Sequence, residues 1–191
     1  MTGEVQALSK RKITEDICRK YGYLVGKQGD KTVHIANYRM SGGGVVGQKI
    51  RTASKNFSIK GSLKDAGFFG QHLFGQGGKM VTVVEGEIDC LAMAQVMGQG
   101  KWPVVSLPNG AQSAAKIFAQ QSEWLSSFER VVIAFDMDDA GQNAAKEAAE
   151  KLPPGKAYIA SLPAKDASDA LLAGKGKELV DSCWQAKAYR P

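Results

Sequence analysis

Hydrophobic positions follow two different patterns along this chain. Up to about residue 78 they form short runs separated by glycine-containing turns, whereas beyond it compact apolar runs alternate with stretches of helical period. The first pattern is typical of antiparallel strands, and the second of a parallel sheet whose strands are joined by helices. We therefore predict a small antiparallel α+β subdomain over residues 1–78 and an α/β subdomain over residues 79–191, joined by the flexible stretch 75–78.

The N-terminal subdomain is predicted to contain one helix and three strands. Apolar residues at helical spacing indicate a helix over residues 13–21, for which Thr14 is the N-cap candidate. Strands are expected over residues 23–25, 32–39 and 45–51. The polar and basic stretch 55–64 is predicted to be a loop.

The second subdomain is predicted to alternate strands with helices. Strands are expected over residues 81–84, 103–107, 130–135 and 156–162. After the first strand, Ile88 and Leu91 mark the apolar side of a helix that continues to about residue 97. Further helices are expected over residues 111–121, 140–152, 167–172 and 178–184. This order predicts a parallel sheet with right-handed crossovers.

Composition excludes several classes of protein. With 43% hydrophobic and 23% charged residues, the 191-residue chain is neither disordered nor fibrous. Its three cysteines, Cys18, Cys90 and Cys183, lie far apart and form neither a disulfide framework nor a zinc site. We therefore expect reduced thiols and a cytoplasmic protein. We also expect no membrane contact, since no apolar run approaches the ~20 residues that span a bilayer.

Charge is distributed unevenly. Residues 1–79 hold 14 Lys and Arg against 5 Asp and Glu, whereas residues 80–191 hold 11 against 14, and the whole chain has a formal net charge of +6. A basic half beside an acidic half suggests a phosphate-rich partner and bound metal ions. On charge alone, a protein that has neither a phosphate-rich partner nor bound metal ions is the favoured interpretation. The sequence Gly77-Gly78-Lys79 is not a P-loop, because Met80 stands where Ser or Thr is needed, so we expect no ATPase activity.

Acidic residues gather where two predicted strands end. Glu85, Glu87 and Asp89 follow one apolar run, and Asp136, Asp138 and Asp139 follow another. Ligands bind at this edge of open α/β sheets, and Asp-x-Asp in extended backbone directs both carboxylates to one face. Such oxygen ligands favour Mg²⁺ or Mn²⁺. The alternative is helix capping, which we favour for Asp139, leave open for Glu87 as a first-turn carboxylate, and do not favour for Glu85, Asp136 and Asp138.

At these residues the sequence resembles a family. Glu85-Gly86 after one strand and Asp136-x-Asp138 after another are the signature of the Toprim domain of primases, topoisomerases and some nucleases. Residues 85–89, 103–107, 135–141 and 162–167 resemble more closely the primase half of phage primase–helicase proteins, with Twinkle-type helicases as relatives. Upstream, residues 48–51 and 55–57 are similar to the same proteins.

The resemblance implies the RNA polymerase domain of a DNA primase, in which a basic subdomain packs on a Toprim subdomain and two metal ions assist nucleotidyl transfer. Glu85, Asp136 and Asp138 would bind the metal ions, with Asp89 and Asp166 in support. The implied phosphate-binding residues are Lys49, Arg51 and Lys55, of which Lys49 and Lys55 would also assist synthesis. A solvated β-edge is the alternative role for these two lysines.

Two positions depart from the family. Ser58 stands where another lysine is expected, for which Lys60 is the substitute, and Asn109 stands where a histidine is expected. Both put the substrate preference in doubt rather than the reaction.

The implied partners are single-stranded DNA and ribonucleoside triphosphates. Relatives carry a zinc-binding module and a helicase domain, so we expect this chain to be a fragment that primes weakly and acts in the cytoplasm of a phage-infected bacterium or of a bacterium itself. A Toprim nuclease and a non-catalytic DNA-binding module of a replicative helicase remain the alternatives.

Overall fold

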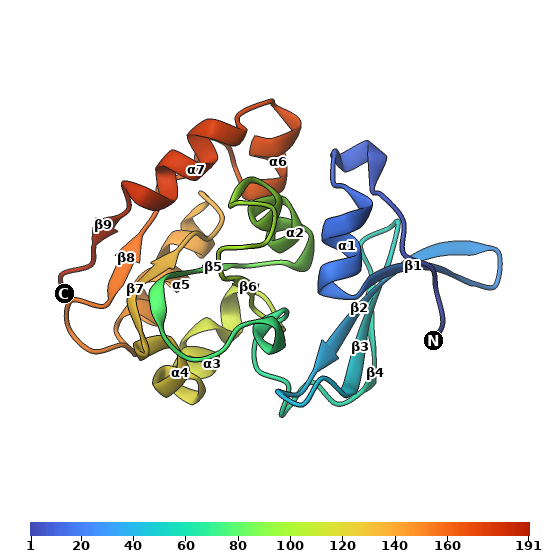
Figure 1. Cartoon of the computed structure of the whole chain (residues 1–191), viewed down its shortest axis with the longest axis horizontal. Coiled ribbons are helices and arrows are strands. Elements are labelled where there is room, and N and C mark those ends of the chain that lie inside the picture. The colour runs from blue at the N-terminus through green and yellow to red at the C-terminus, as the bar shows by residue number, and fades with distance from the viewer.

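Two β-sheets lie on either side of helices α1 (Glu15–Tyr21) and α2 (Glu87–Val96) in the computed structural model, which describes all of residues 1–191 (Figure 1). The first sheet is antiparallel, with strand order β1-β2-β3-β4. Its strands are β1 (Tyr23–Gln28), β2 (Lys31–Arg39), β3 (Val45–Thr52) and β4 (Phe57–Gly61). A 3₁₀ turn, Ser9–Arg11, precedes α1.

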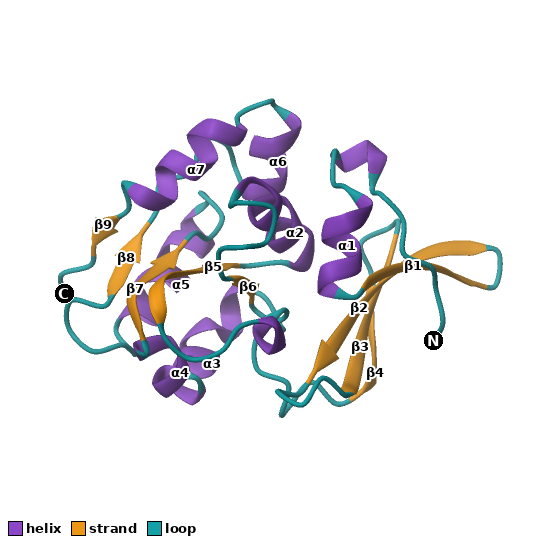
Figure 2. Ribbon diagram, viewed as in Figure 1, coloured by secondary structure: helices purple, strands orange, loops and turns teal.

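The second sheet has the order β6-β5-β7-β8-β9 and is parallel except at β9 (Figure 2). Its strands are β5 (Gly78–Val84), β6 (Val104–Ser106), β7 (Phe128–Ile133), β8 (Ala157–Ile159) and β9 (Lys187–Ala188). The remaining helices are α3 (Ala114–Gln120), α4 (Ser122–Ser126), α5 (Asp139–Ala149), α6 (Ala167–Leu172) and α7 (Gly176–Trp184). Short 3₁₀ turns form at Gln71–Leu73 and Ala111–Ser113.

Both faces of this second sheet are buried. Met80 and Val84 of β5 face the core that contains α2, α6 and α7, whereas Val81 and Val83 face the core that contains α3, α4 and α5. A strand covered on both faces reads as a continuous apolar run, which is why the sequence signal for β5 was strong.

The first of these cores also unites the two sheets. Its 29 buried residues include Tyr21, Tyr23 and Tyr38 from the N-terminal part and most of α2. Tyr21 is fully buried, and its hydroxyl donates a hydrogen bond of 2.8 Å to the carbonyl of Val104 in β6. Hydrophobic contact and this hydrogen bond therefore fix the N-terminal part against the parallel sheet.

Most predicted elements are confirmed, and the differences have physical causes. Residues 57–61 are not loop but strand β4, a fully exposed edge strand stabilised by its ladder with β3. Phe57 and Ile59 alternate with Ser58 and Lys60, which is a strand pattern, but the pattern is short and lies within a polar and basic stretch. The helix expected over 111–121 consists of a 3₁₀ turn followed by α3, and α4 directly after it was missed. Strand β9 was missed and makes one edge of the sheet antiparallel.

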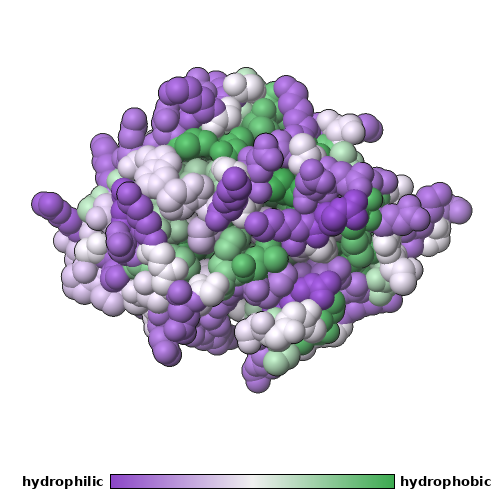
Figure 3. Space-filling model, viewed as in Figure 1, coloured by the Kyte–Doolittle hydropathy of each residue, from purple (hydrophilic) through white to green (hydrophobic).

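Helix α2 also differs from its prediction, since it is buried on more than one side. Seven of its residues are buried, because α1 covers one flank while α6 and α7 cover another. The three cysteines are free and buried, as expected. None of the helices has the length and apolar character needed to cross a bilayer. Hydrophilic residues cover most of the face seen in Figure 3, and hydrophobic atoms show in separate patches between them.

Candidate functional site

The acidic residues meet at the carboxyl edge of the parallel strands. Glu85 directly follows β5, and Asp136 lies three residues beyond the end of the neighbouring strand β7. The Oε1 atom of Glu85 accepts a hydrogen bond of 3.0 Å from the backbone amide of Asp136. The two sequence-predicted acids are therefore in direct contact across adjacent loops.

Two further carboxylates converge on Asp136. Asp89 in the first turn of α2, Asp136, and Asp166 at the start of α6 each place a carboxylate oxygen within 4.8 Å of the others. Asp89 accepts a hydrogen bond of 2.9 Å from the amide of Ser168, and Asp166 accepts one of 2.7 Å from the amide of Asp169. These amides orient the carboxylates and leave other oxygens free for a cation. We call Asp89, Asp136 and Asp166 the acidic triad.

Electrostatics indicate that the acidic triad is suited to a cation. Burial, followed by the charges of Glu85, Asp166 and Asp138, raises the pKa of Asp136 to about 7. Burial likewise raises the pKa of Glu85, and burial together with the charge of Asp166 raises that of Asp89. A bound divalent cation would stabilise the ionised carboxylates, and a donor set of oxygens without His or Cys fits Mg²⁺ or Mn²⁺.

Asp138 lies outside the acidic triad and caps a helix. Its Oδ1 atom accepts a hydrogen bond of 2.9 Å from the amide of Gly141, and its backbone is extended at the N-cap of α5. The expectation that Asp139 is the cap is wrong, because the helix begins one residue earlier than predicted and Asp139 is its first helical residue. Asp138 is exposed, and its Oδ2 atom has no hydrogen-bond partner within the chain.

Gly141 explains how closely α5 packs on the acids. A Cβ atom at this position would lie 2.3 Å from the carbonyl oxygen of Asp136 and 2.7 Å from Oε1 of Glu85. The side-chain amide of Gln142 donates a hydrogen bond of 3.0 Å to the same carbonyl. The first turn of α5 therefore fixes the loop that carries Asp136.

A buried cation faces this acidic edge from the first sheet. Lys49 lies on β3, and its Nζ atom is 3.0 Å from Oε1 of Glu87 and donates a hydrogen bond of 3.0 Å to the carbonyl of Pro108. The hydroxyl of Tyr38 donates a 2.5 Å hydrogen bond to the same carboxylate oxygen of Glu87. Because β3 is an inner strand and the Lys49 side chain is only 13% exposed, the alternative of a solvated edge is wrong for Lys49.

The other predicted basic residues divide between the two faces of the sheet. Arg51 is two residues from Lys49 on β3 and therefore shares its face. Lys55 is exposed in the turn before β4, where its φ is 61°. Lys60 pairs with Gln48, so both it and Ser58 lie on the opposite face. The structure thus brings Lys49 and Arg51 together and places Lys60 away from them.

Several residues of the site were missed by sequence reasoning. Glu87 was left open between the acidic cluster and a first-turn carboxylate; it lies in the first turn of α2, and its pairing with Lys49 was not predicted. Arg11 donates a hydrogen bond of 3.1 Å to Ser168, whose amide holds Asp89. No local motif could have revealed Tyr38 or Arg11, because each acts across more than 45 residues of sequence. The Asn109 side chain, noted as a departure, is exposed in the loop after β6.

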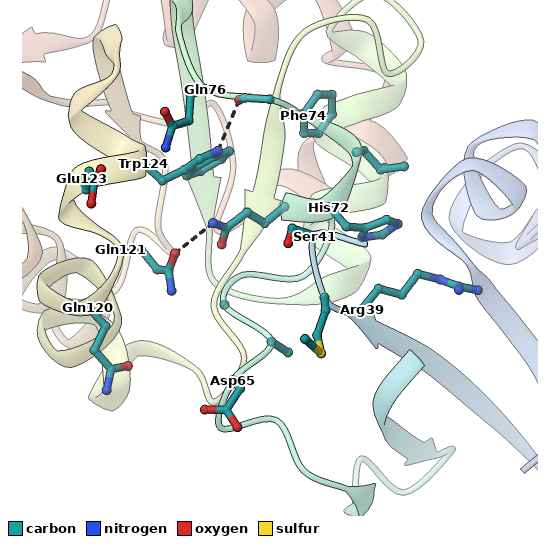
Figure 4. A pocket seen from close by; sticks show the side chains of 16 residues that line it. Arg39, Ser41, Asp65, His72, Phe74, Gln76, Gln120, Gln121, Glu123 and Trp124 are labelled. Atoms are coloured by element: carbon teal, nitrogen blue, oxygen red, sulfur yellow. Dashed lines mark hydrogen bonds between the residues drawn. The ribbon is translucent and has the colours of Figure 1, made fainter. Parts of the chain in front are cut away.

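A separate cavity of about 590 Å³ lies away from the acids. Phe74 and Gln76 on one wall precede β5, and Gln121 and Trp124 on another precede β7, so the cavity adjoins the amino ends of strands whose carboxyl ends carry the acids (Figure 4). The Trp124 indole donates a hydrogen bond of 3.2 Å to the carbonyl of Gly75. The cavity is therefore not part of the acidic site.

Comparison of the sequence with protein families gives two matches. The family described as "Bacteriophage T7 DNA helicase/primase, N-terminal a+b fold" matches residues 3–61, and the family described as "Toprim-like" matches residues 82–171. A DNA helicase/primase of Enterobacteria phage T3 is 40% identical over 189 residues, which cover 99% of this chain. The chain spans 33% of the length of that curated relative.

Solved structures give the same picture. The primase fragment of the bacteriophage T7 primase–helicase protein is 42% identical, with a TM-score of 0.91 over 95% of this chain and 74% of that one. T7 primase domains in a complex with lagging-strand DNA polymerase, an RNA/DNA hybrid and dTTP are 41% identical, with a TM-score of 0.92 over 98% and 94% of the two chains. A DNA primase domain from Pseudomonas aeruginosa shares the fold, with a TM-score of 0.72 at 19% identity over 95% and 71%.

Proposed function

The chain belongs to the family of phage DNA helicase/primase proteins, within their primase part, and we propose that it synthesises short RNA primers on single-stranded DNA. The observation that carries this proposal is the acidic triad with Glu85 on one side and the buried Lys49 on the other. Phosphoryl transfer depends mainly on charge neutralisation and positioning, and this arrangement supplies groups for both.

We assign the metal-binding role to Glu85 and the acidic triad, with Asp138 offering its free oxygen from the start of α5. When bound, Mg²⁺ or Mn²⁺ would activate the primer 3′-hydroxyl and neutralise charge on the leaving pyrophosphate. The amides of Asp136 and Ser168 hold Glu85 and Asp89 in fixed orientations. Such fixed orientation reduces the reorganisation that substrate binding requires.

The basic residues are assigned to the triphosphate and the template. Lys49 is at present neutralised by Glu87, and a triphosphate would offer its ammonium group a second, stronger partner. Arg51 extends the same positive face, and Lys55 lies at its end in the turn before β4. Lys60 would contact nucleic acid only if a strand also passed over the opposite face.

This division of roles corresponds to the two proposed subdomains. Residues 1–78 supply the cations and residues 79–191 the acids, so a substrate would be held between the two sheets. The T7 relative is bound to an RNA/DNA hybrid, and an Aquifex aeolicus relative has a zinc-binding domain. We propose the same classes of partner here: single-stranded DNA, ribonucleotides, and zinc-binding and helicase domains of a longer protein acting in a bacterial cytoplasm.

Extension of an annealed oligoribonucleotide tests the proposal. The purified chain is supplied with single-stranded DNA, labelled ribonucleotides and either Mg²⁺ or Mn²⁺, beside Asp136→Asn and the matched control Glu147→Gln, an exposed acid on α5. We expect metal-dependent extension by the wild type and by Glu147→Gln, and none by Asp136→Asn.

Two outcomes of this assay would overturn the proposed primer synthesis. Shortening of the DNA without extension would identify a nuclease. Neither reaction, even with a zinc-binding module added in trans, would identify a non-catalytic DNA-binding domain.

A further inference from the structure

The edge strand β4 exposes two large apolar side chains side by side on one face. Phe57 is 54% exposed and Ile59 is 51% exposed, and they are two residues apart on the strand. About half of each side chain therefore stays in contact with water, and that half contributes nothing to folding. It therefore requires an explanation outside the core.

The face that carries this apolar pair is the one that borders the acidic edge. Phe57 is opposite Arg51 and Ile59 is opposite Lys49 in the ladder of β3 with β4. Lys49 in turn contacts Glu87, the first residue of α2, and the carbonyl of Pro108 in the loop that follows β6. The apolar pair is thus separated from the carboxyl edge of the parallel sheet by a single side chain.

Cations surround the exposed ring. The Lys49 Nζ atom lies 4.8 Å from the centroid of the Phe57 ring, and the Arg51 guanidinium carbon lies 5.8 Å from it. Lys55 is two residues away in the preceding turn. Aromatic rings set among cations are the arrangement by which proteins bind single strands, since bases stack on the ring while phosphates contact the cations.

We propose that Phe57 and Ile59 form a stacking platform for successive bases of the single-stranded template, which deepens and rests on the proposed primase function. The platform is an open strand edge and does not enclose a ligand, so it suits a continuous strand better than the base of one nucleotide. Its two contact points are roughly 6.6 Å apart along the strand, a spacing compatible with neighbouring bases of an extended single strand. Lys55 and Lys60 at either end disfavour pairing of β4 with another copy of the chain.

Fluorescence anisotropy with a labelled oligothymidylate tests the platform. Phe57→Ala should weaken binding by about 5- to 100-fold, whereas Phe57→Trp should retain binding and show quenched tryptophan fluorescence in the complex. The matched control is Val45→Ala, which removes a 47% exposed apolar side chain from the same sheet and should change the dissociation constant less than twofold. Arg51→Gln should lower the salt dependence of binding by about one phosphate contact, and Phe57→Ala should leave it unchanged.

Photochemical cross-linking provides the second measurement. An oligonucleotide containing 5-iododeoxyuridine should cross-link to the 57–59 peptide on irradiation. Circular dichroism melts establish that each variant is folded, which is expected for changes at exposed positions.

Several results would overturn the platform. One is wild-type DNA affinity in Phe57→Ala. Another is a raised KM for ribonucleotides with unchanged DNA affinity, which would assign the ring to the incoming base. A third is a shift of Phe57→Ala from dimer to monomer in sedimentation, which would assign it to self-association. DNA binding that depends on Phe57 without any primer extension would instead leave the platform standing and contradict the primase function.

Discussion

The ammonium group of Lys49 and the carboxylate of Glu87 are 3.0 Å apart and join the first sheet to α2, since Lys49 belongs to β3 and Glu87 is the first residue of α2. Their side chains are only 13% and 10% exposed, so water screens the pair weakly. Tyr38 donates to the same carboxylate from β2. The interface between the basic and acidic parts of the molecule is therefore held by a buried ionic contact as well as by apolar packing.

Breaking this ion pair should destabilise the fold strongly. Lys49→Met leaves the Glu87 carboxylate buried without its cation, and we expect the free energy of unfolding to fall by about 3 kcal/mol. The double variant Lys49→Met, Glu87→Gln should recover most of the loss. Urea denaturation measures both, with Lys177→Met as the control, because water screens the exposed pair of Lys177 with Asp181 and its loss should change stability little. If Lys49→Met and Glu87→Gln have additive effects on the free energy of unfolding, the two side chains do not interact.

Asp138 permits the structural and chemical roles of a carboxylate to be separated. Asp138→Ala removes the N-cap of α5 and should lower the free energy of unfolding by about 1 kcal/mol, whereas Asp138→Asn keeps a cap of equal strength. Both variants lose the negative charge, and we expect both to reduce primer synthesis by about 100-fold or more while leaving single-strand binding within a few-fold. Thermal melts and extension assays compare them. Full activity in Asp138→Asn would show that the residue serves only as a cap.

The pH dependence of stability should reveal the crowded carboxylates. The pKa of Asp136 is raised to about 7 in the folded chain, first by burial and then by Glu85, Asp166 and Asp138, from an ordinary value of 3.8. The folded state therefore binds more protons than the unfolded state between these values, and stability falls as pH rises from about 4 to 7 before levelling off.

Added Mg²⁺ should restore stability above pH 7, where the carboxylate is ionised. Thermal melts from pH 5 to 8, with and without Mg²⁺, measure both effects, and Asp136→Asn should weaken each of them. An equal response to Mg²⁺ in Asp136→Asn would place the ion elsewhere.

Gly141 should tolerate no side chain despite lying in a helix. Alanine has a helix propensity better than that of glycine by about 1 kcal/mol, yet at residue 141 its Cβ would collide with Asp136 and Glu85. We expect Gly141→Ala to destabilise the chain by about 1–3 kcal/mol and to abolish synthesis. Gly176→Ala is the control, because its Cβ meets only a flexible Val96 methyl at 3.3 Å and should be neutral within about 0.5 kcal/mol.

Tyr21 should report whether the two parts of the chain unfold together. Tyr21→Phe removes the buried hydrogen bond to Val104 and should cost about 1 kcal/mol. Because one core spans both sheets, tryptophan fluorescence, which reports residues 102, 124 and 184, should follow the same denaturation curve as amide exchange in β2. Separate transitions would support subdomains that fold independently around residue 78.

The acids could be predicted from the sequence because the alternation of strands and helices implies a parallel sheet. In such a sheet the carboxyl ends of the strands lie at one edge. Glu85 and Asp136 needed only that rule, whereas Asp89 and Asp166 were identified through the family resemblance. The partner of Lys49 could not be predicted, because Glu87 reaches it only after two sheets have docked. The face on which Lys60 lies depended on recognising β4, whose alternation of Phe57 and Ile59 with polar residues is short and lies within a polar and basic stretch.

Two cross-sheet contacts, Arg11 with Ser168 and Lys49 with Glu87, hold the N-terminal part to α6 and to α2. These two contacts form when the chain folds, so the distance between the two parts is fixed before a substrate binds. Binding then carries little cost of closure. We therefore expect ligands to exchange quickly, with residence times governed by their direct contacts, so that a short product dissociates readily.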